Sequence, residues 1–214
     1  MASAAALFAV VAVIRLAGAF TAALMALSVV LSAVVLLVVP RSDWAVGAGL
    51  RRFAARPAAV GAALVAMAYA VALLGTSAAF GRGKDNWVVW IPELFKGLLP
   101  GPRCLGLVAM LLAMGAIVPL AEEICYRGVL YTALERRMGT NAAILLTAAA
   151  WALVHLGDYG LNPFNVRVMY GALSSVFLMG LALGICRSLT GSTLACAATQ
   201  GMCNMLLLGA VGCL

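Results

Sequence analysis

Long, uninterrupted apolar stretches are the feature that most restricts how this chain can fold. Several are about as long as the roughly 20 residues that a helix needs to cross a bilayer, and their apolar residues do not alternate with polar ones. A segment in lipid must satisfy its own backbone hydrogen bonds, which leaves helices or closed barrels. The composition agrees, with 65% apolar and 10% charged residues and a mean hydropathy of +1.11. The sequence therefore predicts an all-α, polytopic bundle of transmembrane helices.

Six spans are predicted, at about residues 16–39, 58–80, 105–120, 141–156, 168–186 and 192 to near the C-terminus. The third span continues as a helix up to Arg137, and Gly139 breaks it. Between the second and third spans, Trp87, Trp90 and Phe95 lie in a sequence rich in glycine and proline. Aromatic residues favour the membrane–water interface, so we expect this segment to be a loop that lies on the membrane.

The basic residues indicate a membrane partner and no nucleic acid. The chain has 14 Lys and Arg residues against 7 acidic ones, and a net charge of +7. These basic residues do not form the solvated stripe that nucleic-acid binding needs. They are scattered at the ends of apolar stretches, which is the pattern of positive-inside anchoring in a membrane. Assigning the loop at 41–57 to the cytoplasm places more of them in the inner loops than in the outer ones. The six cysteines lie mostly in apolar sequence, which predicts small buried hydrophobic residues.

Two of the seven acidic residues, Glu122 and Glu123, stand side by side at the end of the third span. Ionisable groups at membrane depth cost about 2.5–3.5 kcal/mol each on insertion scales, so they tend to face the protein interior, pair and mark function. Glu123 and Arg127 are four residues apart and can pair on one helix face, whereas Glu122 points about 100° away. The spacing therefore predicts that Arg127 neutralises Glu123 and leaves Glu122 free for proton chemistry.

Two further spans carry polar groups that could join this pair. The single histidine, His155, lies near the end of the fourth span. Taken alone, it is more typical of a hydrogen-bonded core residue, but the glutamate pair favours a functional role. On the last span, Gln200 and Asn204 are four residues apart and share one helix face. These amides could join helices, at about 0.6 kcal/mol each, or donate hydrogen bonds to an oxyanion.

Together these residues resemble the CPBP intramembrane endopeptidases, which include the CAAX-prenyl proteases and bacteriocin-processing proteins. The segment Glu122-Glu123-x-x-x-Arg127-Gly128 is similar to the family's EExxxRG, and Trp151-x-x-x-His155 is similar to its FxxxH. The last span, ending in Asn204, is similar to its HxxxN. One position departs, because Gln200 stands where the family usually has a histidine that is thought to help stabilise the oxyanion.

The resemblance covers roughly residues 105–208 and implies a division of the chain. Residues 1–104 would hold the N-terminal transmembrane helices and the interfacial loop, and residues 105–214 the catalytic helix bundle. The implied activity is hydrolysis of a peptide bond in a membrane-associated protein or peptide. The substrate would be a prenylated protein, a bacteriocin or a sorting-signal precursor. The Ala- and Arg-rich composition is typical of a GC-rich bacterial genome, so we expect an integral protein of the bacterial cytoplasmic (inner) membrane.

The implied mechanism has Glu122 as the general base for an attacking water. His155 would orient the water or relay the proton, and Asn204 with Gln200 would donate hydrogen bonds to the oxyanion. The Glu123–Arg127 pair would hold the helix and set the local field. The two glutamates could also exchange these roles, although the resemblance favours the first as catalytic.

Family members have been described both as metalloproteases and as glutamate-dependent peptidases. A catalytic zinc normally takes three protein ligands, and this chain offers one imidazole and scattered cysteines. We therefore expect no cofactor, and a divalent metal such as zinc is the alternative.

Two other classes of function stay open. A catalytically impaired relative, acting as a membrane scaffold or chaperone, is favoured by Gln200 and disfavoured by the other motif residues, which are all present. A small proton-coupled transporter would need broken helices in related halves of the chain, and no such symmetry is visible in the sequence.

Overall fold

The chain folds into a bundle of helices, as the sequence predicts. A computed structural model describes residues 2–92 and 103–212. The fold is 84% helical, and the described part contains no strand. Five helices are long and apolar enough to cross a membrane, or six if a bent pair near the N-terminus is counted as one span. The prediction of an all-α bundle with about six spans is confirmed.

The elements of the long spans are α4 (Ala55–Phe80), α6 (Arg103–Leu112), α7 (Val118–Glu123), α8 (Tyr131–Met138), α9 (Thr140–Val154), α10 (Val166–Thr190) and α11 (Thr193–Gly212). Their ends follow the local sequence. Gly139, at a φ of 83°, separates α8 from α9, and Gly191, at a φ of 64°, ends α10. The Asn165 side chain accepts hydrogen bonds from two backbone amides in the first turn of α10. These five spans therefore lie where the sequence predicts them, with ends that differ by a few residues.

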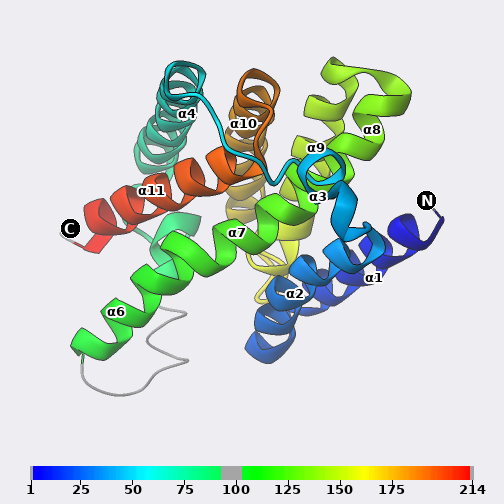
Figure 1. Ribbon diagram of the computed structural model, residues 1–214. Coiled ribbons are helices and arrows are strands. Elements are labelled where there is room, and N and C mark those ends of the chain that lie inside the picture. The colour runs from blue at the N-terminus through cyan, green and yellow to red at the C-terminus, as the bar shows by residue number, and fades with distance from the viewer. Residues whose placement is uncertain (1, 93–102, 213–214) are drawn as a thin grey trace.

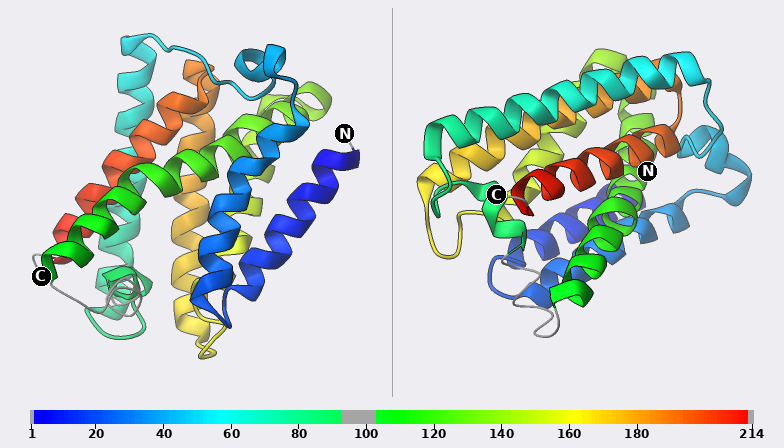
Figure 2. Two further views of the ribbon diagram at one scale, coloured as in Figure 1. Left: turned by 60° about the horizontal axis from the view of Figure 1, so that its bottom comes forward. Right: turned by 90° about the vertical axis from the view of Figure 1, so that its left-hand side faces the viewer.

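The prediction of a single helix over residues 16–39 is wrong. Within this range the structure has α2 (Ala22–Val34, 13 residues), and the residues before it form a separate helix, α1 (Ala2–Ala17, 16 residues), which packs beside α2 (Figures 1 and 2). The chain turns at Gly18, where a Cβ would crowd the Arg15 carbonyl oxygen, and the Thr21 side chain caps α2 by accepting from the Leu24 amide. The apolar sequence that begins before residue 16 is thus divided by a turn into two shorter helices.

The third long helix is wider than an α-helix at two places. The π-helical segments Ala113–Ile117 and Ile124–Leu130 join α6 to α7 and α7 to α8. The first precedes Pro119, which has no N–H and leaves the Gly115 carbonyl without its α-helical partner. A Cβ at Gly201 of α11 would overlap this carbonyl oxygen, so the two helices cross with their backbones in contact. The crossing brings the Gln200 side of α11 against α7.

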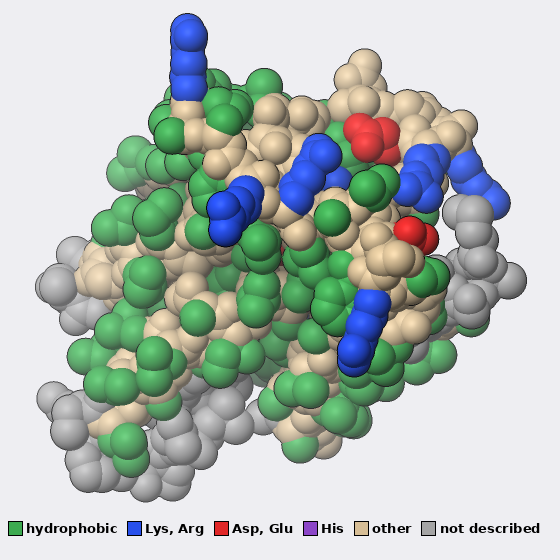
Figure 3. Space-filling model, in the orientation of Figure 1, with side chains coloured by type: hydrophobic (Ala, Val, Ile, Leu, Met, Phe, Trp, Pro, Cys, Tyr) green, Lys and Arg blue, Asp and Glu red, His purple; other side chains and the backbone are tan. Residues whose placement is uncertain are grey.

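The remaining helices complete the bundle and divide it into two ends. α10 packs lengthwise against α4 and also against α9 (Figures 1 and 2). At one end, Arg51 donates to the Gly191 carbonyl, and Ser192 donates back to the Arg51 carbonyl. Two loops that the sequence assigns to the inner side therefore lie together. Figure 3 shows Lys and Arg side chains in the upper half of this view, and hydrophobic side chains over much of the rest.

The described part of the segment after α4 packs against the helix bundle, and its place at the membrane interface stays a prediction. The Trp87 side chain is 3% exposed, and its ring lies 5.3 Å from that of Tyr159. Val88 and Ile91 are also buried. The described part of this loop therefore folds back onto the bundle, because its apolar side chains bury more surface there. Phe95 of the same prediction lies outside the described residues.

The helix crossing at Gly201 gives a test of the fold. A Gly201→Ala substitution forces a Cβ into the Gly115 carbonyl, and such overpacking costs about 1–3 kcal/mol. We expect the midpoint of thermal unfolding in detergent to fall by roughly 2–12 °C. The matched control is Gly209→Ala on the same helix, where a Cβ meets nothing within 4 Å. Equal midpoints for the two variants would contradict the crossing.

Candidate active site

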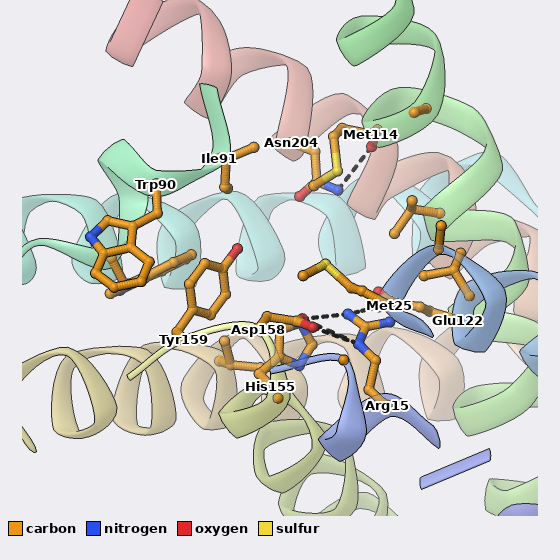
Figure 4. A pocket seen from close by; sticks show the side chains of 18 of the residues that line it. Arg15, Met25, Trp90, Ile91, Met114, Glu122, His155, Asp158, Tyr159 and Asn204 are labelled. Carbon is orange, nitrogen blue, oxygen red and sulfur yellow. Dashed lines mark hydrogen bonds and ion pairs between the residues drawn. The ribbon is translucent and has the colours of Figure 1, made fainter. Parts of the chain in front are cut away.

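A cavity of about 780 Å³ lies inside the bundle, and four of the predicted site residues line it. Its wall comes from α1, α2, α4, the segment at 87–91, the region around α7, the end of α9, α10 and α11. Most lining residues are apolar. The polar side chains that line it include Glu122, His155, Gln200 and Asn204 from the sequence prediction, together with Arg15 and Asp158. Figure 4 shows these residues apart from Gln200.

Glu122 is buried, and both oxygens of its carboxylate have partners. Its side chain is at the end of α7 and the residue is 2% exposed. Gln200 donates a hydrogen bond from Nε2 to Oε2 over 2.9 Å. Arg15 places Nη2 at 3.2 Å from Oε1. The sequence did not predict this cation, because it comes from α1, more than a hundred residues away in the chain.

Glu123 and Arg127 form the predicted pair, but they do not line the cavity. Both residues are fully buried, and Arg127 Nη1 donates to Glu123 Oε1 over 2.5 Å. Arg127 also donates from Nη2 to the Gly180 carbonyl of α10 over 3.0 Å. Its guanidinium lies 4.7 Å from the centre of the Trp151 ring of α9. The Arg127 side chain thus connects three helices behind the cavity wall, and its role is to hold the bundle together.

His155 stands in the turn His155–Gly157 that follows α9. Its Nδ1 lies 2.7 Å from the Trp151 carbonyl oxygen, which can only accept a hydrogen bond. Nδ1 therefore carries the hydrogen, and in the neutral ring Nε2 presents a lone pair. Nε2 lies 3.8 Å from Asp158 Oδ2, which is too long for a direct hydrogen bond. The ring is thus oriented by its own helix, with its basic nitrogen on the side of Asp158.

Asn204 is fixed by two hydrogen bonds from different helices. Its Oδ1 accepts from the Tyr69 hydroxyl of α4 over 2.9 Å, and its Nδ2 donates to the Met114 carbonyl over 2.9 Å. An amide nitrogen has two hydrogens, so one stays available for a ligand in the cavity. The Gln200 amide likewise uses one N–H on Glu122, and its Oε1 is buried without a hydrogen-bond partner among the described residues.

Three polar residues of this site were missed from the sequence: Arg15, Tyr69 and Asp158. Arg15 donates from Nε and Nη2 to the two oxygens of Asp158, over 2.9 and 2.5 Å. A charge inside an apolar stretch, and an acid three residues after the histidine, were available as signals. The pairing itself joins residues 143 apart in the chain, which no local pattern encodes. Tyr69 carried no signal beyond a polar group in an apolar helix.

The donor set around Glu122 does not fit a catalytic zinc. Such a zinc takes three protein ligands, chiefly His with carboxylate or Cys. Within residues 2–92 and 103–212, no group of three or more His, Cys, Asp and Glu side chains is arranged to hold a metal ion. The cationic group that lies against both Glu122 and Asp158 is the Arg15 guanidinium (Figure 4).

The helices suit a bilayer, and a buried glutamate lines an apolar cavity between them, an arrangement compatible with an intramembrane protease. A family model described as type II CAAX prenyl endopeptidase Rce1-like matches residues 104–206. This match over nearly half of the chain agrees with the predicted resemblance to the CPBP endopeptidases. The match and the apolar helices indicate an integral membrane protease that acts on membrane-associated proteins. Searches of curated proteins and of solved structures found no match.

The division at residues 104 and 105 stays a prediction. The matched range includes the elements that carry Glu122, His155, Gln200 and Asn204. The cavity nevertheless draws on both parts of the chain, because α1, α2 and α4 also line it.

The Glu123–Arg127 pair gives a test of its structural position. Arg127→Met leaves a buried carboxylate without its cation, and breaking such a pair costs about 3–5 kcal/mol. We expect that loss in the free energy of unfolding, measured in mixed detergent micelles. The double variant Glu123→Gln/Arg127→Met removes both charges and should recover part of the loss. The exposed pair of Arg167 and Asp85 is the control, because Arg167→Ala should change stability little. Additive effects of the two buried substitutions would contradict the pairing.

Proposed function

We propose that this protein is an intramembrane endopeptidase in which Glu122 activates a water molecule to hydrolyse a peptide bond of a membrane-associated protein or peptide. The family supports a CAAX-type endopeptidase activity in general. The observation that supports the water-activation mechanism is the position of Glu122. It is a buried carboxylate in the wall of a mostly apolar cavity, with His155 and Asn204 in the same wall.

The proposed reaction is a general-base hydrolysis. Glu122 takes a proton from water as the water oxygen bonds to the carbonyl carbon of the substrate. The resulting tetrahedral intermediate carries a negative oxygen. Glu122 then returns the proton to the amide nitrogen as the C–N bond breaks, which releases a carboxylic acid and an amine. The lone pair on His155 Nε2 can accept the second hydrogen of the water and orient it for attack.

The two amides of α11 have complementary parts in this reaction. Asn204 is held from both sides and keeps one N–H for the oxyanion. Gln200 fixes Glu122 through one N–H and has a second for the same purpose. Removal of one such donor in an oxyanion site costs about 10²–10³-fold in kcat. Gln200 is a neutral donor, so its hydrogen bond to the oxyanion lacks the positive charge that a protonated histidine at this position would add.

The reaction is proposed to proceed without a metal. The support for this is that the chain has one imidazole, and that the Arg15 guanidinium lies against the carboxylates of both Glu122 and Asp158. A lone carboxylate with an oriented histidine is enough for general-base chemistry. The scaffold reading is the alternative, because Gln200 departs from the family motif.

The substrate class is also part of the proposal. The apolar side chains of the cavity wall suit a hydrophobic or lipid-modified segment of a substrate. The polar side chains of Glu122, His155 and Asn204 are placed to act on the scissile peptide bond of that segment. Prenylated proteins, bacteriocins and sorting-signal precursors all meet this description. A bacterial inner membrane is the proposed location.

The Glu122→Gln variant tests the mechanism. The isostere keeps its size and hydrogen bonds but cannot accept a proton, so cleavage of reporter peptides should fall by about 10²–10⁴-fold. The reporters are a prenylated CAAX-type peptide, a bacteriocin leader and a C-terminal sorting signal, assayed with purified protein in liposomes. The matched control is Glu135→Gln at the end of α8, where the carboxylate bonds to Tyr131 and Thr140 outside the cavity. It should retain wild-type activity.

A chelator in the same assay separates the remaining alternatives. We expect wild-type cleavage to persist in the chelator. Loss that is restored by zinc would overturn the metal-free mechanism, and full activity of Glu122→Gln would overturn the role of Glu122. A folded wild-type protein that cleaves none of the reporters would favour the scaffold reading.

A further inference from the structure

We propose that Arg15 is a positioning residue of the active site: seated by Asp158, its guanidinium keeps the Glu122 carboxylate charged and directed into the cavity. This inference rests on the proposed function for its effect on catalysis. The arrangement itself is a bridge, in which one cation from α1 contacts the carboxylates of α7 and of the turn after α9.

The bridge is asymmetric, and the asymmetry gives each carboxylate its part. Asp158 binds Arg15 through both oxygens, by Nε over 2.9 Å and by Nη2 over 2.5 Å. Glu122 meets the same Nη2 at 3.2 Å and with one oxygen. Bidentate pairs are the stronger and more oriented ones, so Asp158 fixes the guanidinium. Glu122 is held more loosely, as a group that must accept and return a proton requires. Figure 4 shows the three side chains joined in this way.

The charges around Glu122 make it depend on Arg15. Its neighbour Glu123 is already neutralised by Arg127, and its second partner, Gln200, is neutral. Arg15 is the one cation within ion-pair distance of Glu122 among the described residues. Without it, Asp158 would keep the His155 ring at 3.8 Å, but Glu122 would have no cation beside it. A buried carboxylate without a counter-charge takes up a proton. A protonated Glu122 cannot act as a base.

The position of α1 does not depend on the Arg15 side chain alone. A Cβ at Gly157 would overlap the Arg15 carbonyl oxygen, so the α1 backbone touches the turn that carries His155 and Asp158. Beyond the end of α1, Asn162 donates to the Ala19 carbonyl over 2.9 Å. These contacts hold α1 against the bundle when the side chain at position 15 is changed. Side-chain variants therefore test the charge and not the docking of the helix.

An infrared measurement tests the charge without any substrate. The band of Glu122 is isolated by subtracting the spectrum of a Glu122→Gln partner from each background. We expect ionised carboxylate bands in the wild type and in Arg15→Lys, and a protonated carboxyl band in Arg15→Ala at neutral pH. Ionised bands for Glu122 in Arg15→Ala would overturn the inference.

Kinetics and chemical rescue test the effect on the reaction. We expect Arg15→Ala to lower kcat by about 10²-fold with little change in KM, because the base is misplaced and uncharged while the cavity remains. Guanidinium ion should restore part of kcat by entering the space left by the side chain, and Arg15→Lys should retain more activity than Arg15→Ala. Urea, which has a similar shape and no charge, should not restore it. The control is Arg167→Ala, whose side chain is 71% exposed and should respond to neither additive.

The outcomes separate this inference from the proposed function. If the wild type is active and Arg15→Ala keeps its kcat, the positioning role is wrong while the peptidase remains. Equal rescue of kcat by guanidinium and urea would also overturn it. The loss of activity in Arg15→Ala would then come from the empty space left by the side chain and not from the missing charge. If the wild type cleaves none of the reporters, the proposed function fails, and the infrared bands still decide whether Arg15 controls the charge of Glu122.

Discussion

The rest of the structure depends on holding one carboxylate, that of Glu122, inside a bundle of apolar helices. A buried charge is costly unless a counter-charge and hydrogen bonds compensate it. Here Arg15 and Gln200 each take one oxygen of the carboxylate. Both partners reach it because backbones come into contact, α1 at Gly157 and α11 at the carbonyl of Gly115. The small residues of the chain therefore have a chemical consequence, since they let helices approach closely enough to satisfy a charge in the interior.

Two adjacent glutamates occupy two different environments as a result. Glu123 points behind the cavity wall, where Arg127 pairs with it and joins three helices. Glu122 lies about 100° around the helix and faces the cavity. The Glu123–Arg127 pair stabilises the bundle, whereas the Glu122 carboxylate lies where a substrate carbonyl could meet it. The match to the Rce1-like family model agrees with this division, because the matched range contains both glutamates.

Features encoded by local sequence could be predicted, and those encoded by distant contacts could not. Gly139 marked a helix end, the spacing of Glu123 and Arg127 marked a pair, and the apolar context marked buried cysteines, as Cys125 and the three other described free cysteines are. The hairpin of α1 and α2 was missed because hydropathy alone does not show a turn inside an apolar stretch. The contacts of Arg15 with Asp158, and of Tyr69 with Asn204, depend on helix packing across more than a hundred residues. The sequence therefore named four residues that line the cavity, but it missed Arg15 and Tyr69, which contact two of them.

The central claim is that Glu122 activates water and does not itself attack the substrate. A single turnover in ¹⁸O-labelled water, with enzyme in excess, tests this most directly. Mass spectrometry of the cleaved reporter and of the enzyme fragment that contains Glu122 would locate the label. The account predicts ¹⁸O in the new carboxyl group of the product and none in Glu122. Label in the Glu122 carboxylate would contradict it, because that result requires a covalent bond between Glu122 and the substrate.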